Sequence, residues 1–444
     1  MAGENYNYLL VFHHVATYSL SMENVKKRTQ IKLGALFNNY QIDFYLFIAT
    51  VFFFMFLLQM WVLTFYYGIS ANERLTWIAQ DGNWAGENWG NDLATGKHFF
   101  SDLLALRELK IIENSYTHPY PPFPVLLSKM LFWLPYKINL YIYLIMFLIA
   151  LVYPIYSATK HLDFYRRLNF TVIFGLMSIA TISGLDRANM ECIIPLLLFL
   201  FYKNRDINPS KSAIYLGLAI GLKITPMVFF LFYLFHRSRY KQIIIASITA
   251  ITINVLSAQI MGASNLILLL NKILTQNQTI QSNYIGFGPI PTNISGYQLI
   301  LNTAYKLNIE ENSLVNYFLV NPGYAILLIF LLLITGYTIA SNETKFLYPL
   351  YGMQLLTLIS WNYHKTWGIV ACAILLELDK KRAERVFDRL VWWLIIIFTT
   401  TPLVFYAPNT INLFPTLSFV LLLILIITNI VVFIRGSKTK GSLK

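Results

Sequence analysis

The stretch that decides the fold is residues 212–235, "SAIYLGLAIGLKITPMVFFLFYLF". It is long enough to cross a membrane once, and basic residues flank both of its ends. The flanking residues are Lys203, Arg205 and Lys211 before it and Arg237, Arg239 and Lys241 after it. A single crossing would put one basic cluster on the wrong side, because Lys and Arg gather in cytoplasmic loops.

Two short helices that meet near Lys223–Pro226 would remove this conflict. Proline breaks a helix and moves the preceding residue out of the helical conformation. Each leg of roughly 12 residues would cover about 18 Å at a rise of 1.5 Å per residue. That is less than the hydrocarbon thickness of about 30 Å. We therefore predict a short broken hairpin, with Lys223 in a cavity that dips into the outer leaflet.

The rest of the chain has the composition of a polytopic membrane protein. Of its 444 residues, 57% are hydrophobic and 12% are charged, which is about half the charged fraction of a soluble domain. The net charge of +13 fits basic cytoplasmic loops and does not indicate a nucleic-acid partner. Cys192 and Cys372 both lie in apolar runs, so we interpret them as core residues and not as a disulfide or metal ligands.

We predict an all-α transmembrane bundle of about 12 spans, with the hairpin counted as two. The others are placed near 43–67, 138–158, 169–183, 188–202, 243–261, 322–340, 346–360, 366–378, 390–407 and 413–434. The expected parts are a cytoplasmic segment 1–42, a single transmembrane domain 43–435 and a cytoplasmic tail 436–444. This topology places 23 of the 34 Lys and Arg residues inside, as short cytoplasmic loops require.

No cleavable signal peptide is predicted near the start of the sequence. The first apolar stretch, residues 9–22, is interrupted by two histidines and lacks a basic segment before it. Met22 is a second candidate for the start of translation.

The polar motifs fall on the predicted outer face. Two long outer loops, 68–137 and 262–321, lie there together with the shorter segments. The motifs are "HPYPP" (118–122), "GLDRAN" (184–189), the tip at Lys223, "NYIGFGPIPTNISG" (283–296) and "SWNYHK" (360–365). The inner loops hold basic residues and little else. This asymmetry predicts a catalytic chamber at the outer membrane face, with the long first loop as its wall or lid.

The ionisable residues of this chamber suit transfer from a lipid phosphate. A carboxylate can deprotonate an incoming hydroxyl, and cations can hold a departing phosphate. The candidates are the carboxylates Asp81, Asp92 and Asp102, the cations Arg187 and Lys223, and the imidazole of His364. No D-x-D, H-E-x-x-H, G-x-S-x-G or Walker motif occurs, so the magnesium clamp used with nucleotide sugars is missing.

Four segments together resemble a known family. In order they are "HPYPPFPVLL", "GLDRANMECIIPLLLF", "YLGLAIGLKITPMVFFLFYLFHRSRYK" and "ISWNYHKTW". They are similar to the GT-C superfamily of polyprenyl-phosphate-sugar glycosyltransferases, and most of all to glycosyltransferase family 87, over roughly residues 43–380. The resemblance implies a GT-C type fold and a hexosyltransferase, with no metal or other cofactor. It also implies a polyprenyl-phosphate-mannose donor and a glycolipid or glycan acceptor.

The resemblance also assigns residue roles. The family's base is an Asp early in the first loop; Asp92, 28 residues before Tyr120, fits best, and Asp81 and Asp102 stay as alternatives. The motifs place Arg187, Lys223 and His364 on the donor phosphate. Tyr120 and Asn189 are the further substrate-binding candidates. The family's S-W-x-H-H segment is Ser360–His364 here, and it keeps only the second histidine.

Other readings of these residues stay open. Lys223 could extend its charge to the membrane interface, Arg187 could pair with Asp186 at a helix start, and His364 could be an ordinary boundary residue. A lipid or glycan transporter would be polytopic too, but should show internal repeats and polar residues at the bilayer midplane. A polysaccharide polymerase or ligase usually has its large outer loop late in the chain. A structural membrane subunit would not need Lys223.

The predicted topology can be tested by labelling with a membrane-impermeant thiol reagent. We expect Ser101→Cys to be labelled from outside and Ser238→Cys from the cytoplasmic side. Labelling of both positions from the same side would contradict the outer chamber.

Overall fold

The protein is described from a computed structural model. The described residues are 43–51, 54, 121–131, 136–178, 181, 190–235, 237–263, 267–272, 274–275, 295–306, 321–341, 344–357, 365–380, 386–400 and 413–441. They form helices and turns and contain no strand, which confirms the predicted all-α class for this part of the chain. The chain divides into two compact units, Met1–Thr50 and Val51–Lys444. In the first unit, residues 43–50 are helical.

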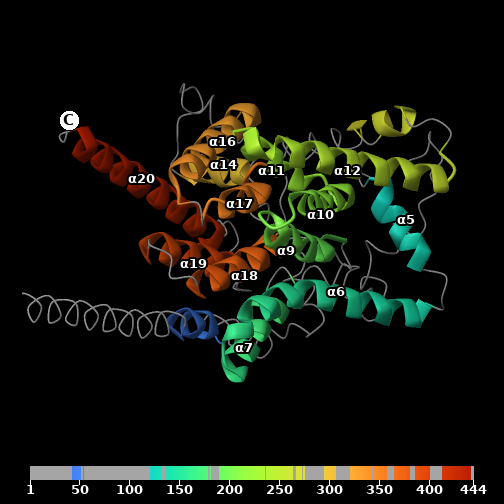
Figure 1. The fold of residues 1–444 in the computed structure, drawn as a ribbon, viewed down its shortest axis with the longest axis horizontal. Coiled ribbons are helices and arrows are strands. Elements are labelled where there is room, and N and C mark those ends of the chain that lie inside the picture. Colours follow the sequence, from blue (N-terminus) through green and yellow to red (C-terminus); the bar gives the residue numbers. More distant parts are fainter. Residues whose placement is uncertain are drawn as a thin grey trace, which may run out of the picture. The chain divides into compact units, whose positions relative to one another are not determined.

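Four helices among the described residues are long and apolar enough to cross a membrane. Each overlaps a predicted span. They are α6 (Tyr136–Ala158), α12 (Tyr240–Ile260), α16 (Pro322–Ile339) and α20 (Leu413–Gly441) (Figure 1). The apolar part of α20 ends at Ile434, and the helix continues into the basic tail.

The other described helices within the second unit are shorter than a full span. Most of them cover part of a predicted span. They are α7 (Phe164–Phe170) with the π-helix η2 (Thr171–Leu176), the 3-10 turn η3 (Met190–Ile193) with α9 (Ile194–Asn204), α17 (Leu347–Leu355), α18 (Trp367–Lys380) and α19 (Val386–Thr400). Two more lie in predicted outer loops, α5 (Pro122–Leu131) in the loop 68–137 and α14 (Gly296–Lys306) in the loop 262–321. The remaining two, α10 (Pro209–Leu222) and α11 (Val228–Tyr233), form the segment predicted to be a broken hairpin. The total of about 12 spans and the domain limits after residues 42 and 435 stay predictions.

Several helices begin at a proline. Pro122 starts α5 (Pro122–Leu131), Pro209 starts α10 (Pro209–Leu222), and Pro322 starts α16. Proline suits this position because its fixed φ is helical and the missing N–H would have no partner within the helix. At α10 an asparagine cap adds to this, since the Asn208 side chain accepts a hydrogen bond of 3.1 Å from the next turn.

The helix predicted to break inside residues 212–235 does break. α10 ends at Leu222, and Lys223 has extended backbone angles (φ −157°, ψ 142°). A 3-10 turn, η4 (Thr225–Met227), contains Pro226, and a short helix, α11 (Val228–Tyr233), follows. The two legs are unequal, with 14 residues in α10 and 6 in α11.

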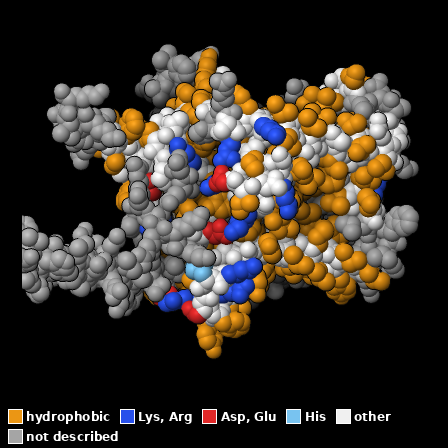
Figure 2. Space-filling view, in the orientation of Figure 1, with side chains coloured by type: hydrophobic (Ala, Val, Ile, Leu, Met, Phe, Trp, Pro, Cys, Tyr) orange, Lys and Arg blue, Asp and Glu red, His pale blue; other side chains and the backbone are white. Residues whose placement is uncertain are grey.

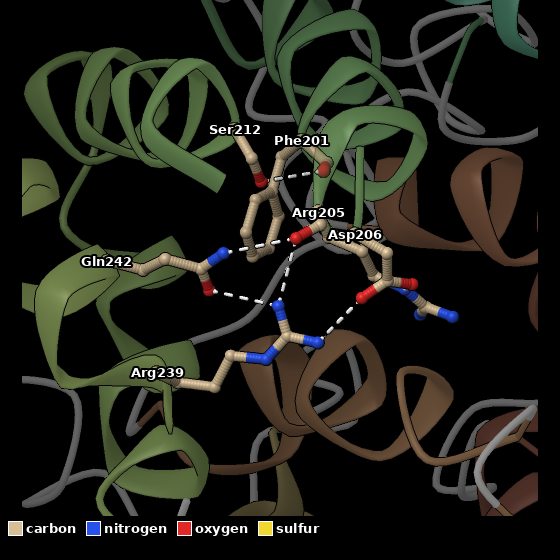
Figure 3. Close-up of polar contacts among 6 residues, drawn as sticks. All are labelled: Phe201, Arg205, Asp206, Ser212, Arg239 and Gln242. Carbon is tan, nitrogen blue, oxygen red and sulfur yellow. Dashed lines mark hydrogen bonds and ion pairs between the residues drawn. The ribbon is translucent and has the colours of Figure 1, made fainter. Parts of the chain in front are cut away.

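The two ends of this broken segment meet, as a hairpin requires (Figure 3). The Arg239 guanidinium donates to Asp206 Oδ1 at 2.7 Å and to the Arg205 carbonyl at 2.9 Å. The Gln242 side-chain amide donates to the same carbonyl at 3.3 Å. Because Arg205 and Asp206 precede α10 and Arg239 follows α11, the basic clusters before and after the hairpin lie at one end of it.

The charge at this end is compensated. Partial burial would raise the pKa of Asp206, but hydrogen bonds from Arg239 and Arg205 outweigh it, and the pKa lies below its ordinary value. Asp206 therefore stays ionised at neutral pH. A second ion pair, Lys203 Nζ to Glu377 Oε1 at 2.7 Å, joins α9 to α18. On the face shown in Figure 2, charged side chains gather in one region, and hydrophobic side chains cover the surface over α6.

The core is centred on α18. This helix contacts α6, α9, α17 and α19, and almost every side chain from Trp367 to Leu378 is buried. An apolar helix that is covered on all sides belongs to the interior of a large protein. Cys192 and Cys372 are both fully buried, so the interpretation of both as core residues is confirmed.

We expect the Arg239 contacts to stabilise the hairpin measurably. Arg239→Ala should lower the free energy of unfolding by about 1–2 kcal/mol, since it removes charged hydrogen bonds at a partly exposed site. Thermal unfolding of the purified protein would show a lower Tm. Lys241→Ala removes the same charge from a nearby exposed residue and should leave the Tm nearly unchanged. Equal losses in both variants would contradict this role for Arg239.

Candidate active site

The candidate site surrounds the turn at Lys223. The Lys223 backbone N–H donates to the Ala219 carbonyl at 3.1 Å, which closes the last turn of α10. Its side chain is half-buried and leaves the helix where the backbone becomes extended. An ionisable residue within an apolar segment is costly and is a functional candidate for that reason.

A single side chain joins the Lys223 turn to the proline-rich motif. Asn254, in α12, accepts a hydrogen bond from the Phe123 backbone N–H at 3.0 Å. Its amide also donates to the Gly221 carbonyl at 3.3 Å and to the Ala250 carbonyl at 2.9 Å. Phe123 follows "HPYPP" and Gly221 precedes Lys223 by two residues, so two motifs that are about 100 residues apart in the sequence meet at Asn254.

This meeting depends on a close approach of α10 to α12. Gly217 and Gly221 are four residues apart, the spacing at which small residues let two membrane helices pack closely. A Cβ atom at Gly217 would lie 2.6 Å from the Ala246 carbonyl oxygen, and one at Gly221 would lie 2.8 Å from Ile253 Cγ2. Side chains at these positions would therefore push α10 away from Asn254.

The segment that leads to "SWNYHK" also packs against this turn. η4 and α11 both contact α17, and a Cβ at Gly352 would lie 3.1 Å from Val228. At the end of α17, Gln354 Oε1 accepts a hydrogen bond of 2.8 Å from the Trp367 indole, which starts α18. The helices on the two sides of the motif are thus joined to each other.

Two further motifs are followed by elements that contact α10 or α17. η3, which follows "GLDRAN", contacts α6, α9 and α10. α14 begins at Gly296, the end of "NYIGFGPIPTNISG", where a Cβ would lie 2.6 Å from the Leu355 carbonyl at the end of α17. The described elements next to the five motifs are therefore connected by contacts through α10, α17 or α12.

Of the predicted site residues, the structure describes Lys223 alone. The others lie outside the described residues: Asp81, Asp92, Asp102, Tyr120, Arg187, Asn189 and His364. Their predicted roles are neither supported nor contradicted by the geometry. Lys365, the neighbour of His364, is buried, with 4% of its surface exposed. Within the described ranges, no group of three or more His, Cys, Asp or Glu side chains is placed to hold a metal ion.

Asn254 is not among the residues that the sequence predicts for the site. A signal was present, because "ITAITINVLSAQI" places the amide of Asn254 in the middle of an apolar run, and a polar side chain inside a membrane segment usually has a partner or a function. Nothing in the sequence shows, however, that its partners lie in α5 and α10.

The fold and the comparisons define the class of protein. Within the described residues, four apolar helices of spanning length accompany a helix that breaks at a lysine, as in a membrane protein. The family model described as glycosyltransferase family 87 matches residues 116–360, which is more than half of the chain. The protein therefore belongs to glycosyltransferase family 87 and is a membrane glycosyltransferase.

The matched segment contains the whole region built around Asn254. It runs from the residues just before "HPYPP" to Ser360, and it ends before His364. The first-loop aspartates precede it. Searches among curated proteins and among solved structures find no match.

Proposed function

We propose that this protein transfers a sugar, with mannose as the first candidate, from a polyprenyl-phosphate donor to a hydroxyl of a glycolipid or glycan. The proposed site is a GT-C type chamber that faces outward from the plasma membrane. The observation that supports the proposal is Lys223, a cation at a helix break, whose preceding turn is joined through Asn254 to Phe123 at the end of the proline-rich motif. Membership in family 87 and the absence of a D-x-D motif support the choice of donor.

The reaction would be a single displacement. The acceptor oxygen forms a bond to the anomeric carbon while the bond from that carbon to the donor phosphate oxygen breaks. Asp92 takes the proton of the acceptor hydroxyl, with Asp81 and Asp102 as the alternative bases. The bonding electrons leave with the polyprenyl phosphate, whose charge is balanced by Lys223 together with Arg187 and His364. A single displacement inverts the configuration at the anomeric carbon.

Lys223 is well suited to the leaving phosphate. Its backbone ends α10, and its half-buried side chain extends from that point. A charge in a poorly solvated position interacts more strongly with an anion than the same charge in water. Tyr120 and Asn189, which adjoin α5 and η3 in the sequence, are proposed to contact the sugar or the acceptor.

The donor can be tested with the purified enzyme. We expect turnover of a polyprenyl-phosphate sugar, with no requirement for added nucleotide sugar and no loss of activity in a metal chelator. Turnover of a nucleotide sugar without any lipid donor would contradict the proposal.

The roles of base and cation can be separated by substitution. Asp92→Asn should lower the turnover rate about 10²–10⁴-fold, as loss of a general base does, and should leave donor binding nearly unchanged. Lys223→Ala should weaken donor binding as well, because it removes the charge that faces the phosphate. Turnover rates and binding of the lipid phosphate measure the two effects.

The alternative bases provide the controls. If Asp92→Asn is active and Asp81→Asn or Asp102→Asn is inactive, the general base is the other aspartate, and the single-displacement mechanism still holds. Activity in all three variants would contradict a mechanism with one base.

A further inference from the structure

We infer that Asn254 is a positioning residue. It fixes the position of Lys223 relative to the proline-rich motif, because it caps both the start of α5 and the end of α10. The inference rests on the proposed function, in which Lys223 binds the donor phosphate. Asn254 itself acts through the backbone of α5 and α10, and the donor is the same polyprenyl phosphate.

The first cap is at the start of α5. The first N–H groups of a helix have no partner within the helix, and Pro122 and Pro124 have none to offer. Phe123 therefore carries the only N–H donor among the first three residues. Pro121, which precedes the helix, has no side-chain acceptor. Asn254 Oδ1 supplies the acceptor at 3.0 Å from a residue 131 positions away.

The second cap is at the end of α10. The last carbonyl groups of a helix also lack intrahelical partners. The Ala219 carbonyl is satisfied by the Lys223 N–H. The Gly221 carbonyl accepts from Asn254 Nδ2 at 3.3 Å. An uncapped carbonyl in an apolar environment is costly, so this contact favours the helix ending at the observed residue.

The three contacts of Asn254 fix the orientation of its amide. The oxygen must face Phe123, whose N–H is a donor, and the nitrogen must face the carbonyls of Gly221 and Ala250. One planar group thereby sets the distance between α5 and the Lys223 turn. Aspartate at this position could accept from Phe123 but could not donate to either carbonyl.

A control variant distinguishes positioning of Lys223 from a general contribution of a buried amide to stability. Asn429 is likewise an asparagine in a long apolar helix, and it is more buried than the half-buried Asn254, with 2% of its surface exposed. Its helix, α20, packs on α16 and α19. Asn254→Leu and Asn429→Leu remove the same chemical group from a long apolar helix, and only the first removes it from the helix that contacts the Lys223 turn.

The test measures the kinetics of the full-length enzyme with a polyprenyl-phosphate sugar. We expect Asn254→Leu to raise the KM for the donor about tenfold, on the scale of lost intramolecular hydrogen bonds. Asn254→Asp should raise it as well, and Asn429→Leu should leave it unchanged. In the Lys223→Ala enzyme, adding Asn254→Leu should change the donor KM by less than about twofold, since the group being positioned is already gone. An unchanged KM in Asn254→Leu, or additive losses in the double variant, would overturn the inference.

A second measurement does not depend on activity. The alkylation rate of a Lys223→Cys variant reports how firmly the turn is held, and the buried Cys192 and Cys372 of the parent protein give the background. We expect Asn254→Leu to increase this rate several-fold and Asn429→Leu to leave it unchanged; equal rates would overturn the inference. If the parent enzyme does not use lipid-phosphate donors, the proposed function fails, and this measurement still decides the role of Asn254.

Discussion

A helix that stops within an apolar environment leaves backbone groups without hydrogen-bond partners, and this constraint governs the region around Lys223. Water is absent from a bilayer interior, so other protein groups must satisfy these donors and acceptors. Here one side-chain amide, Asn254, satisfies a donor of α5 and an acceptor of α10. The close packing of α10 on α12 follows from the same requirement, since a longer distance would break the second contact.

The opposite end of the hairpin is stabilised by ion pairs. There, the charged groups compensate one another: Arg239 contacts Asp206 and the backbone of Arg205, and Lys203 contacts Glu377. The hairpin therefore has one end held by ion pairs and one end held by a neutral amide. The amide beside the Lys223 turn therefore adds no charge of its own to the charge of the lysine.

The break at Lys223 could be predicted from the sequence because its causes are local. A lysine, a proline and two basic flanks within 40 residues are sufficient to indicate it. Asn254 could not be assigned, because its partners Phe123 and Gly221 become neighbours only when three helices pack. The short lengths of α17 and α9 were also missed, since apolar composition shows what can be buried and does not show where a helix ends. The aspartates of the first loop lie outside the described residues, so their part of the site remains a prediction from sequence resemblance.

The separation of 131 residues between Phe123 and Asn254 also has a consequence for biogenesis. Ribosomes add about 5–20 residues per second, so α5 leaves the ribosome roughly 7–26 seconds before the residue that caps it. During this interval the proline-rich segment has no native anchor from α12. The contact between α5 and the Lys223 turn can therefore form only after α12 has entered the membrane, and a chain released before that point would carry the proline-rich motif and Lys223 without the residue that joins them.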